Sequence, residues 1–298
     1  MIEISKELKK KAVEALQEIR PKFSGSNNNF AKQWGFTGSV WSRMRSGEVD
    51  GLIKDSLWLH ICRELDVTTG KQKLKPARTD VFQIIEEDVL FCKENAKSRM
   101  FVDEPEIGKT VALKYLAKTL PNCFYIDASQ SKTQQLFVRA LAKAIGLDNR
   151  GTYNDLKGYI KAYLKILPQP IVLIDEAGDL NENSFLDLKE YWNATEGCCA
   201  FYLAGAEGLL EKIKRCIEHK KVGFRELYSR FGSSYTSIVP TGKQEKKAFY
   251  MKLIDDVLTH NLEDKTIIPQ IIKKCITEDK DANIGGLRRL ESILILNK

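Results

Sequence analysis

The stretch Met100–Val111, MFVDEPEIGKTV, decides the fold of this chain. Its Gly108-Lys109-Thr110 stands after an apolar strand end and before a helical stretch, which is how a phosphate-binding loop ends. Roughly 65 residues downstream, Ile171–Glu176, IVLIDE, is a short apolar strand that closes on two adjacent carboxylates. A phosphate loop followed by a carboxylate pair in this order predicts a site for a magnesium nucleotide, ATP–Mg²⁺.

The chemistry of the site explains its residue types. Backbone N–H groups over Gly108–Val111 point at phosphate, where the helix dipole also favours negative charge. We expect Lys109 to bridge the β- and γ-phosphates and Thr110 to supply a hydroxyl ligand to Mg²⁺. Asp175 is the second predicted magnesium ligand, and Glu176 is the predicted catalytic residue that orients or deprotonates the attacking water. The alternative is a chance Gly-Lys-Thr at a helix start.

The phosphate loop departs from its usual form, G-x-x-x-x-G-K-[ST], at two positions. Asp103 occupies the first glycine position and Glu106 the position where a middle glycine is common. Glycine is favoured there because the chain wraps closely around phosphate and needs positive φ. Two carboxylates beside a triphosphate repel it unless they point outward. We therefore expect weaker ATP binding than a standard loop gives, and slow hydrolysis.

Length and composition fit one large α/β domain with small helical additions, because the chain has 298 residues and is 43% hydrophobic. No apolar stretch approaches the roughly 18 residues that span a membrane, and the charged N-terminus has no signal-peptide core. The seven cysteines show no zinc spacing, which predicts reduced thiols in a cytoplasmic protein. The net charge of +7 suits contact with nucleic acid. A basic cluster at Lys212, Lys214, Arg215, Lys220 and Lys221 contributes to this charge. Contact with nucleic acid and a solvated helical face are equal alternatives for the cluster.

The N-terminal residues 1–67 are predicted to form an all-α domain. A helix over Ile4–Arg20 precedes a short helix (Phe30–Trp34), a glycine turn, a second short helix (Ser39–Ser46) and a third over Ile53–Leu65. This order is the helix-turn-helix plan, with an ordinary three-helix bundle as the alternative. The residues expected to face DNA are Ser39, Ser42, Arg43 and Arg45. Those expected to pack inside are Ala31, Phe36, Val40, Ile53 and Leu57.

A polar, basic linker (68–79) leads to an α/β core (80–240) and then to a helical region (241–298). Within the core, strands alternate with helices in units of about 30 residues, which predicts a parallel sheet covered on both faces. Strands are expected at the phosphate loop, at Cys123–Ser129, at Ile171–Ile174 and at Cys198–Leu203. Helices are expected at Val81–Asn95, from Lys109 to Leu120, at Thr133–Ile145, at Ile160–Leu167 and at Ser184–Thr195.

Two arginine-bearing segments add a family resemblance. FRELYSRFGSS carries Arg225 and Arg230 at the end of a helix, and NIGGLRRLESIL carries Arg288 at the start of the last one. With these segments the chain resembles the AAA+ ATPases over about 80–298. The resemblance implies a P-loop AAA+ parallel-sheet core with a small helical lid. It also implies that Arg230, or else Arg225, is an arginine finger acting on a neighbouring subunit, and that Arg288 touches the γ-phosphate in its own chain. A surface arginine at a helix end is the alternative for each.

The whole layout resembles one group of transposition ATPases, the B proteins of transposable phages such as Mu and of their prophage relatives. That resemblance implies an ATP-dependent DNA-binding protein, largely indifferent to sequence, in a bacterial host cell. Such proteins assemble on duplex DNA as a helical filament or ring and deliver target DNA to a transposase. Lys132 and Thr133, after the second strand, are candidates for lining the DNA channel. The strand ending at Leu203 is followed by Ala-Gly-Ala-Glu, where many AAA+ proteins carry a polar residue that positions water.

Three other functions fit the sequence. One is a regulator whose helix-turn-helix domain reads a specific operator while the ATPase core acts as a switch. The second is a replication helper that loads or unloads a helicase. The third is a binding module without ATPase activity, which would follow if Asp103 and Glu106 abolished nucleotide binding.

Overall fold

The computed structural model describes residues 4–23, 25–65, 67, 74–276 and 285–296. It divides into two compact units, one of residues 1–73 with 141–156 and the other of residues 74–140 with 157–298. Half of the predicted linker, residues 68–73, lies outside the described residues. No helix in the described ranges is both long and apolar enough to cross a membrane.

The N-terminal region is helical. Its helices are α1 (Lys6–Ile19), η1 (Arg20–Lys22), α2 (Asn27–Gln33), α3 (Gly38–Arg45) and α4 (Asp55–Glu64). Ser26 and Thr37 cap α2 and α3, each accepting a hydrogen bond from a backbone N–H three residues on. Gly35, at φ +83°, makes the turn between these two helices.

Large aromatic side chains fill the centre of this helical region. Phe30, Trp41 and Trp58 are almost fully buried there, together with Met44 and Ile61. Of the residues predicted to pack inside, Ala31 and Phe36 are buried, whereas Val40, Ile53 and Leu57 are partly buried around that centre. The sequence analysis did not name the two tryptophans among the residues expected to pack inside.

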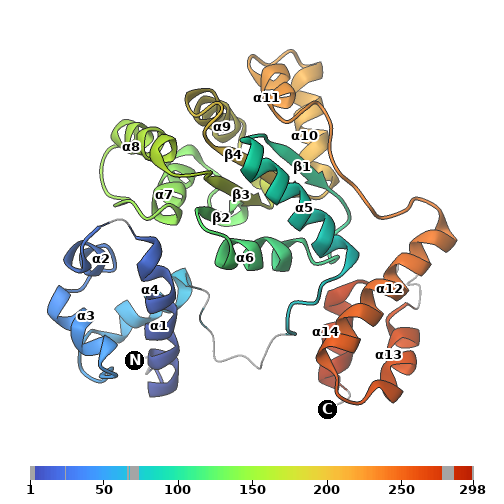
Figure 1. The fold of residues 1–298 in the computed structure, drawn as a ribbon, viewed down its shortest axis with the longest axis horizontal. Coiled ribbons are helices and arrows are strands. Elements are labelled where there is room, and N and C mark those ends of the chain that lie inside the picture. The colour runs from blue at the N-terminus through green and yellow to red at the C-terminus, as the bar shows by residue number, and fades with distance from the viewer. Residues whose placement is uncertain (1–3, 24, 66, 68–73, 277–284, 297–298) are drawn as a thin grey trace. The chain divides into compact units, whose positions relative to one another are not determined.

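Four parallel strands form the sheet of the second unit, in the order β1-β4-β3-β2 (Figure 1). They are β1 (Arg99–Val102), β2 (Cys123–Asp127), β3 (Ile171–Asp175) and β4 (Ala200–Gly205). Every residue of β3 and β4 is buried, as expected for inner strands of a sheet covered on both faces. The prediction of a parallel α/β core is confirmed.

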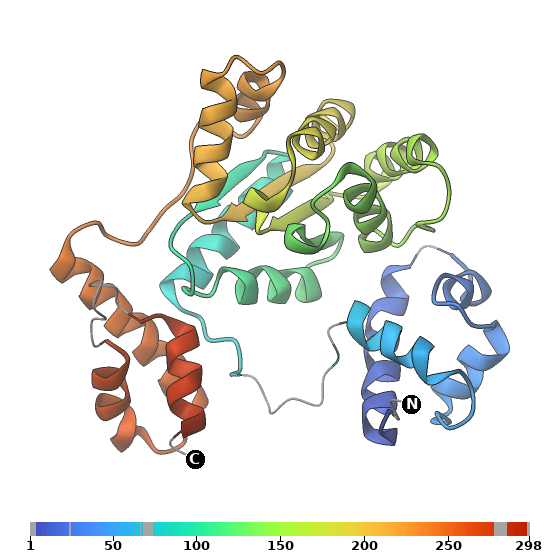
Figure 2. The ribbon, with the colours of Figure 1, turned by 180° about the vertical axis from the view of Figure 1, so that it is seen from behind.

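Helices precede, connect and follow these strands along the chain. They are α5 (Asp80–Asn95), α6 (Lys109–Thr119), α7 (Gln134–Ala144), α8 (Tyr153–Ile166), α9 (Glu182–Ala194), α10 (Glu207–Glu218) and α11 (Phe224–Arg230), with the short turns η2 (Ala128–Gln130) and η3 (Ala177–Asp179). Helices α5 and α6 cover one face of the sheet, where alternate strand residues such as Leu173 and Tyr202 join their apolar side chains (Figures 1 and 2). The sequence analysis proposed no bounds for α10.

After α11 the chain returns to the outer edge of β1. Thr236 forms an isolated parallel bridge with Phe101. Its N–H donates to the carbonyl of Met100 at 2.8 Å, and its carbonyl accepts from Val102 at 3.0 Å. This contact extends the sheet by about one residue pair, so we call residues 236–240 the edge segment.

Among the described residues after the edge segment, the chain forms the helices α12 (Lys243–Asn261), α13 (Ile268–Cys275) and α14 (Leu287–Leu296), with a short turn η4 (Lys265–Ile267). Their own apolar cluster includes Ile254, Leu258, Ile271 and Leu290. Tyr250 and Leu253, near the middle of α12, instead join the apolar cluster of the sheet. The helical C-terminal region predicted as a lid is therefore anchored to the core through α12.

Candidate nucleotide-binding site

The phosphate loop connects the end of β1 to the start of α6. Helix α6 begins at Lys109, with Gly108 at φ +100° as its N-cap, so Thr110 and Val111 lie in its first turn. The N–H groups of that first turn have no partner within the helix, which makes this end of α6 a place for an anion. The structure thus places Gly108, Lys109, Thr110 and Val111 together, as the sequence analysis expected.

Lys109 is folded back into the loop. Its side chain is buried, and its Nζ donates to the carbonyl of Asp103 at 2.8 Å and to that of Glu104 at 2.5 Å. Burial lowers the pKa of Lys109, an effect that the negative charges of Asp103 and then Glu176 oppose. The ammonium is therefore held where phosphate oxygens would sit, by carbonyl groups that a phosphate can replace.

The carboxylate pair lies at the carboxyl end of β3, within electrostatic reach of Lys109. Asp175 is only 2% exposed. One of its oxygens accepts from the N–H of Glu176 at 3.0 Å and the other from the Tyr125 hydroxyl at 2.9 Å. Glu176 is exposed at φ +48°, a left-handed conformation that turns it away from the strand. Partial desolvation, and then the charge of Asp175, raise the pKa of Glu176.

These residues fit a magnesium nucleotide. A buried aspartate and a helix-terminal threonine hydroxyl supply the oxygen ligands that Mg²⁺ prefers, and the lysine and free N–H groups suit its phosphates. Tyr125 is a member of the site that the sequence analysis missed. It stands two residues before Asp127, which lies beside Asp175 in the β2–β3 register, so the pairing of two strands was needed to find it.

Asp103 does not face the place of a phosphate. One carboxylate oxygen accepts from the backbone N–H groups of Ile238 at 2.6 Å and Val239 at 3.1 Å, and the other accepts from Glu104 at 2.8 Å. The side chain is 4% exposed. The repulsion expected from a carboxylate pointing at the triphosphate therefore does not apply to Asp103, because its oxygens are turned to the edge segment.

Glu104 and Glu106 face the C-terminal helices. Glu104 pairs with Lys246 and accepts from the Tyr250 hydroxyl at 2.7 Å, both on α12. Glu106, at φ +65°, accepts at its carbonyl from the N–H of Leu287 at 3.0 Å. Its carboxylate lies 3.8 Å from the guanidinium of Arg288, which is 77% exposed. The predicted lid arginine is thus beside the phosphate loop.

Comparison with known families agrees with this geometry. Residues 93–213 match the family model described as AAA domain. This region, which includes all four strands of the sheet, is therefore similar to an AAA domain. A solved structure titled as the Aeropyrum pernix ORC1 protein in complex with DNA is similar in fold, with a TM-score of 0.51 and 13% sequence identity. The similarity covers 74% of this chain and 59% of that one, so this chain spans about three fifths of the length of that protein. No curated protein matches the chain.

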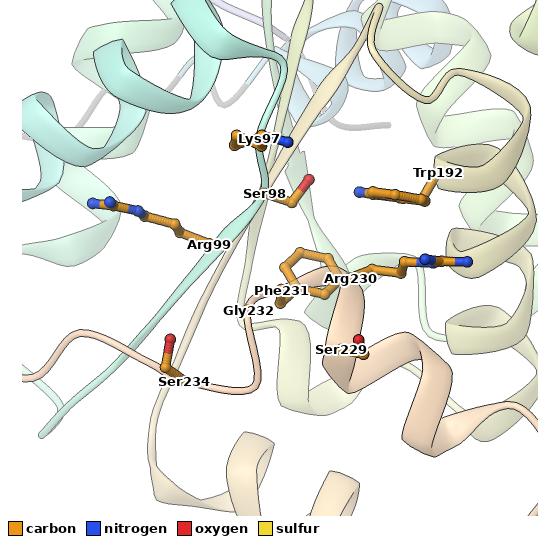
Figure 3. A pocket seen from close by; sticks show the side chains of 9 residues that line it. All are labelled: Lys97, Ser98, Arg99, Trp192, Ser229, Arg230, Phe231, Gly232 and Ser234. Atoms are coloured by element: carbon orange, nitrogen blue, oxygen red, sulfur yellow. The ribbon is translucent and has the colours of Figure 1, made fainter.

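The two candidate finger arginines lie on α11, after the region that matches the AAA domain model. Arg225 is exposed, and Arg230 lines a pocket of about 390 Å³ with Lys97, Ser98, Arg99, Trp192, Ser229, Phe231, Gly232 and Ser234 (Figure 3). Arg99 starts β1, whereas the phosphate loop follows its end, and four strand residues span about 13 Å. The structure does not bring Arg230 or Arg225 together with Lys109 of the same chain.

Arg230 lies against an aromatic ring. Its guanidinium is 4.4 Å from the ring centroid of Trp192, a cation–π contact visible in Figure 3. Its Nε is buried and has no hydrogen-bond partner among the described residues. Trp192 is a second neighbour that the sequence analysis missed, because it comes from α9, far from Arg230 in sequence.

The candidate DNA-contacting residues lie in two separate places. Ser39, Ser42, Arg43 and Arg45 are all exposed on α3, while Trp41 and Met44 of the same helix are buried. Arg43 is paired with Glu48 at 2.7 Å. Lys132 and Thr133 are exposed after β2, where Lys132 pairs with Asp179 at 2.9 Å.

The basic cluster that follows β4 is partly used inside the protein. Lys212 donates to the carbonyl groups of Gly178 and Leu180, and Lys221 pairs with Glu182. Lys214, Arg215 and Lys220 are exposed. The residue after β4 is Ala206, so the strand end next to the phosphate loop lacks a polar side chain there, as the sequence indicated.

Proposed function

We propose that this chain is an ATP-dependent, largely sequence-nonspecific DNA-binding AAA+ ATPase that assembles on target DNA and activates a transposase. The observation that carries the ATPase part is the grouping of Lys109, Asp175 and Glu176 at the carboxyl ends of the parallel strands. The presence of an AAA domain supports it. The DNA and transposase parts rest on the residue patterns and the resemblance described above.

Each residue of the site has a role in this proposal. Lys109 and the N–H groups at the start of α6 would bind the phosphates, and Thr110 and Asp175 would hold Mg²⁺. Bound magnesium supplies charge neutralisation at the transferred phosphate. Glu176 would orient the attacking water and take its proton, and Arg288 would bind the γ-phosphate after leaving Glu106.

Assembly follows from the place of Arg230. A guanidinium stabilises charge on a transferred phosphate only when it touches it, and Arg230 lines a pocket at the start of β1, whereas its own phosphate loop follows the end of that strand. A finger role for Arg230, or for Arg225, therefore requires a second copy of the chain. A head-to-tail contact of this kind builds a ring if it closes and a helical filament if it does not.

The DNA contacts are proposed at the exposed face of α3 and at Lys132 and Thr133. Small hydroxyl groups and arginines on α3 suit backbone phosphates and groove edges, and the excess of basic residues favours a polyanion. A specific regulator is the second candidate, because α2, the Gly35 turn and α3 have the order and spacing of a helix-turn-helix unit. A helicase-loading helper would bind DNA poorly without its partner.

Duplex-DNA binding with and without ATP–Mg²⁺, followed by electron microscopy, tests the proposal. We expect nucleotide-dependent filaments or rings on unrelated sequences, with affinity that falls steeply as salt rises. Lys109→Ala should abolish them, while Lys118→Ala, an exposed lysine in the last turn of the same helix, should not. If the protein instead binds one DNA site roughly 10³-fold or more tightly than other sequences, and does so without nucleotide, the proposal is wrong and the protein is a sequence-specific regulator. Adding a transposase to the filaments would test the last part through its strand-transfer rate.

A further inference from the structure

We propose that Asp103 is a positioning residue that couples the phosphate loop to the edge segment, and through it to the finger helix α11 and to the lid. The inference rests on the proposed ATPase function. It assigns a role to the residue that stands where a phosphate loop normally begins with glycine.

The hydrogen bonds of Asp103 continue the pairing of β1 with the edge segment. Thr236 makes two backbone hydrogen bonds with β1, to Met100 and from Val102. Beyond Thr236 the backbones no longer pair, and the Asp103 carboxylate accepts from Ile238 and Val239 in place of a strand carbonyl. A glycine at this position could hold neither N–H group. Because hydrogen bonds to a charged acceptor are the stronger kind, this contact fixes the edge segment firmly.

A second buried carboxylate holds the same segment. Asp88 of α5 accepts from the Thr236 hydroxyl at 2.9 Å and pairs with Arg99 at the start of β1. Asp88 is 6% exposed. The edge segment is thus held at Thr236 by Asp88 of α5, and at Ile238 and Val239 by Asp103 of the phosphate loop.

The edge segment stands between two functional elements. Arg230 ends α11 six residues before Thr236, and α12 of the lid begins at Lys243, three residues after Pro240. The neighbouring loop residue Glu104 holds α12 directly through Lys246 and Tyr250. When phosphate binds, Lys109 exchanges the carbonyl groups of Asp103 and Glu104 for phosphate oxygens. Because one of the released carbonyl groups belongs to Asp103, the change in the loop is passed through the Asp103 side chain to the segment between α11 and α12.

The test begins with hydrogen exchange of the full-length protein without nucleotide. Asp103→Gly should speed exchange at the Ile238 and Val239 amides by about tenfold or more, because both lose a charged acceptor. Asp103→Asn keeps one acceptor oxygen without the negative charge, so its exchange rates should fall between those of the natural protein and the glycine variant, which covers the case in which the glycine variant folds poorly. Glu196→Gly, an exposed carboxylate in the turn after α9, is the matched control and should leave both amides unchanged.

The second measurement separates positioning from a purely structural role. In DNA-stimulated ATP hydrolysis, Asp103→Gly should lower kcat by about tenfold while nucleotide Kd stays within about threefold, because the phosphate contacts are untouched and the coupling is lost. Unchanged kcat, or unchanged amide exchange, would overturn the inference. So would tighter ATP binding with a higher kcat, since Asp103 would then only hinder phosphate. If the natural protein itself neither binds nor hydrolyses ATP, the proposed function fails instead, and the exchange result still reports whether Asp103 holds the segment.

Discussion

The end of β3 and the phosphate loop serve the same predicted ligand, yet they are built in different ways. At the end of β3, Asp175 and Glu176 follow the usual pattern, and the support comes from within the sheet, where the Tyr125 hydroxyl of the neighbouring strand donates to Asp175. In the loop, three positions carry carboxylates, and each has acquired a partner in the C-terminal part of the chain. The difference shows that departures from a binding pattern are informative when each unusual side chain has a specific contact.

Replacing Lys109 should give the largest effect in this comparison, because both regions depend on its charge. We expect Lys109→Ala to weaken ATP binding by about 100-fold or more, since a buried cation and its phosphate contacts are removed together. Calorimetric titration with ATP–Mg²⁺ measures this directly. Lys118→Ala is the control on the same helix, and equal affinity in both variants would contradict the assigned site.

Glu176→Gln should separate chemistry from binding. We expect the hydrolysis rate to fall by about 10²-fold or more with ATP affinity nearly unchanged, because the variant keeps the shape of the side chain and removes only the base. Single-turnover hydrolysis beside equilibrium titration gives both numbers. A parallel loss of affinity would instead show that Glu176 holds the magnesium nucleotide.

The pH dependence of the same reaction gives a second view of Glu176. Its pKa is raised from the ordinary glutamate value of 4.5, so the ionised form needed of a base appears at higher pH than usual. We expect kcat to increase as the pH rises above 4.5, because Glu176 ionises in that range, and we expect this increase to be absent in Glu176→Gln. If kcat of the natural protein instead increases only at or below pH 4.5, the pKa of Glu176 is not raised and the environment described here is wrong.

Tyr125→Phe tests the support of the carboxylate pair. The variant removes the hydroxyl that donates to Asp175 at 2.9 Å and leaves the ring in place. We expect magnesium affinity in the presence of ATP to fall by about tenfold, the usual range for a residue that orients a metal ligand. Tyr159→Phe, in which an exposed tyrosine loses the same hydroxyl, is the control. A result equal to that control would show that Asp175 needs no support from Tyr125.

The sequence predicted the parallel sheet, the order of the elements and the residues at both strand ends, because these depend on short local patterns. Gly108 to Thr110 and the pair Asp175–Glu176 are local in this sense. The partners of Asp103, Asp175 and Arg230 are instead Ile238, Tyr125 and Trp192, which come from distant segments and depend on strand order and helix packing. Such contacts have no local signal, so the direction of the Asp103 carboxylate needed the structure.

Glu106→Gly should give the smallest effect and sharpens the contrast with Asp103. Glu106 adopts φ +65°, a backbone conformation that is strained for a residue with a side chain and relaxed for glycine. Its carboxylate pairs with the Arg288 guanidinium at 3.8 Å. Removing it relieves the backbone and frees the arginine for phosphate, so we expect ATP to bind about threefold more tightly, with thermal stability unchanged or slightly raised. In Asp103→Gly the affinity should stay the same, because that carboxylate is already turned to the edge segment. Titration of the two variants side by side decides between them. If both glycine variants tighten binding equally, the two acidic residues act only through their negative charge, and their contacts with the C-terminal segments have no part in nucleotide affinity.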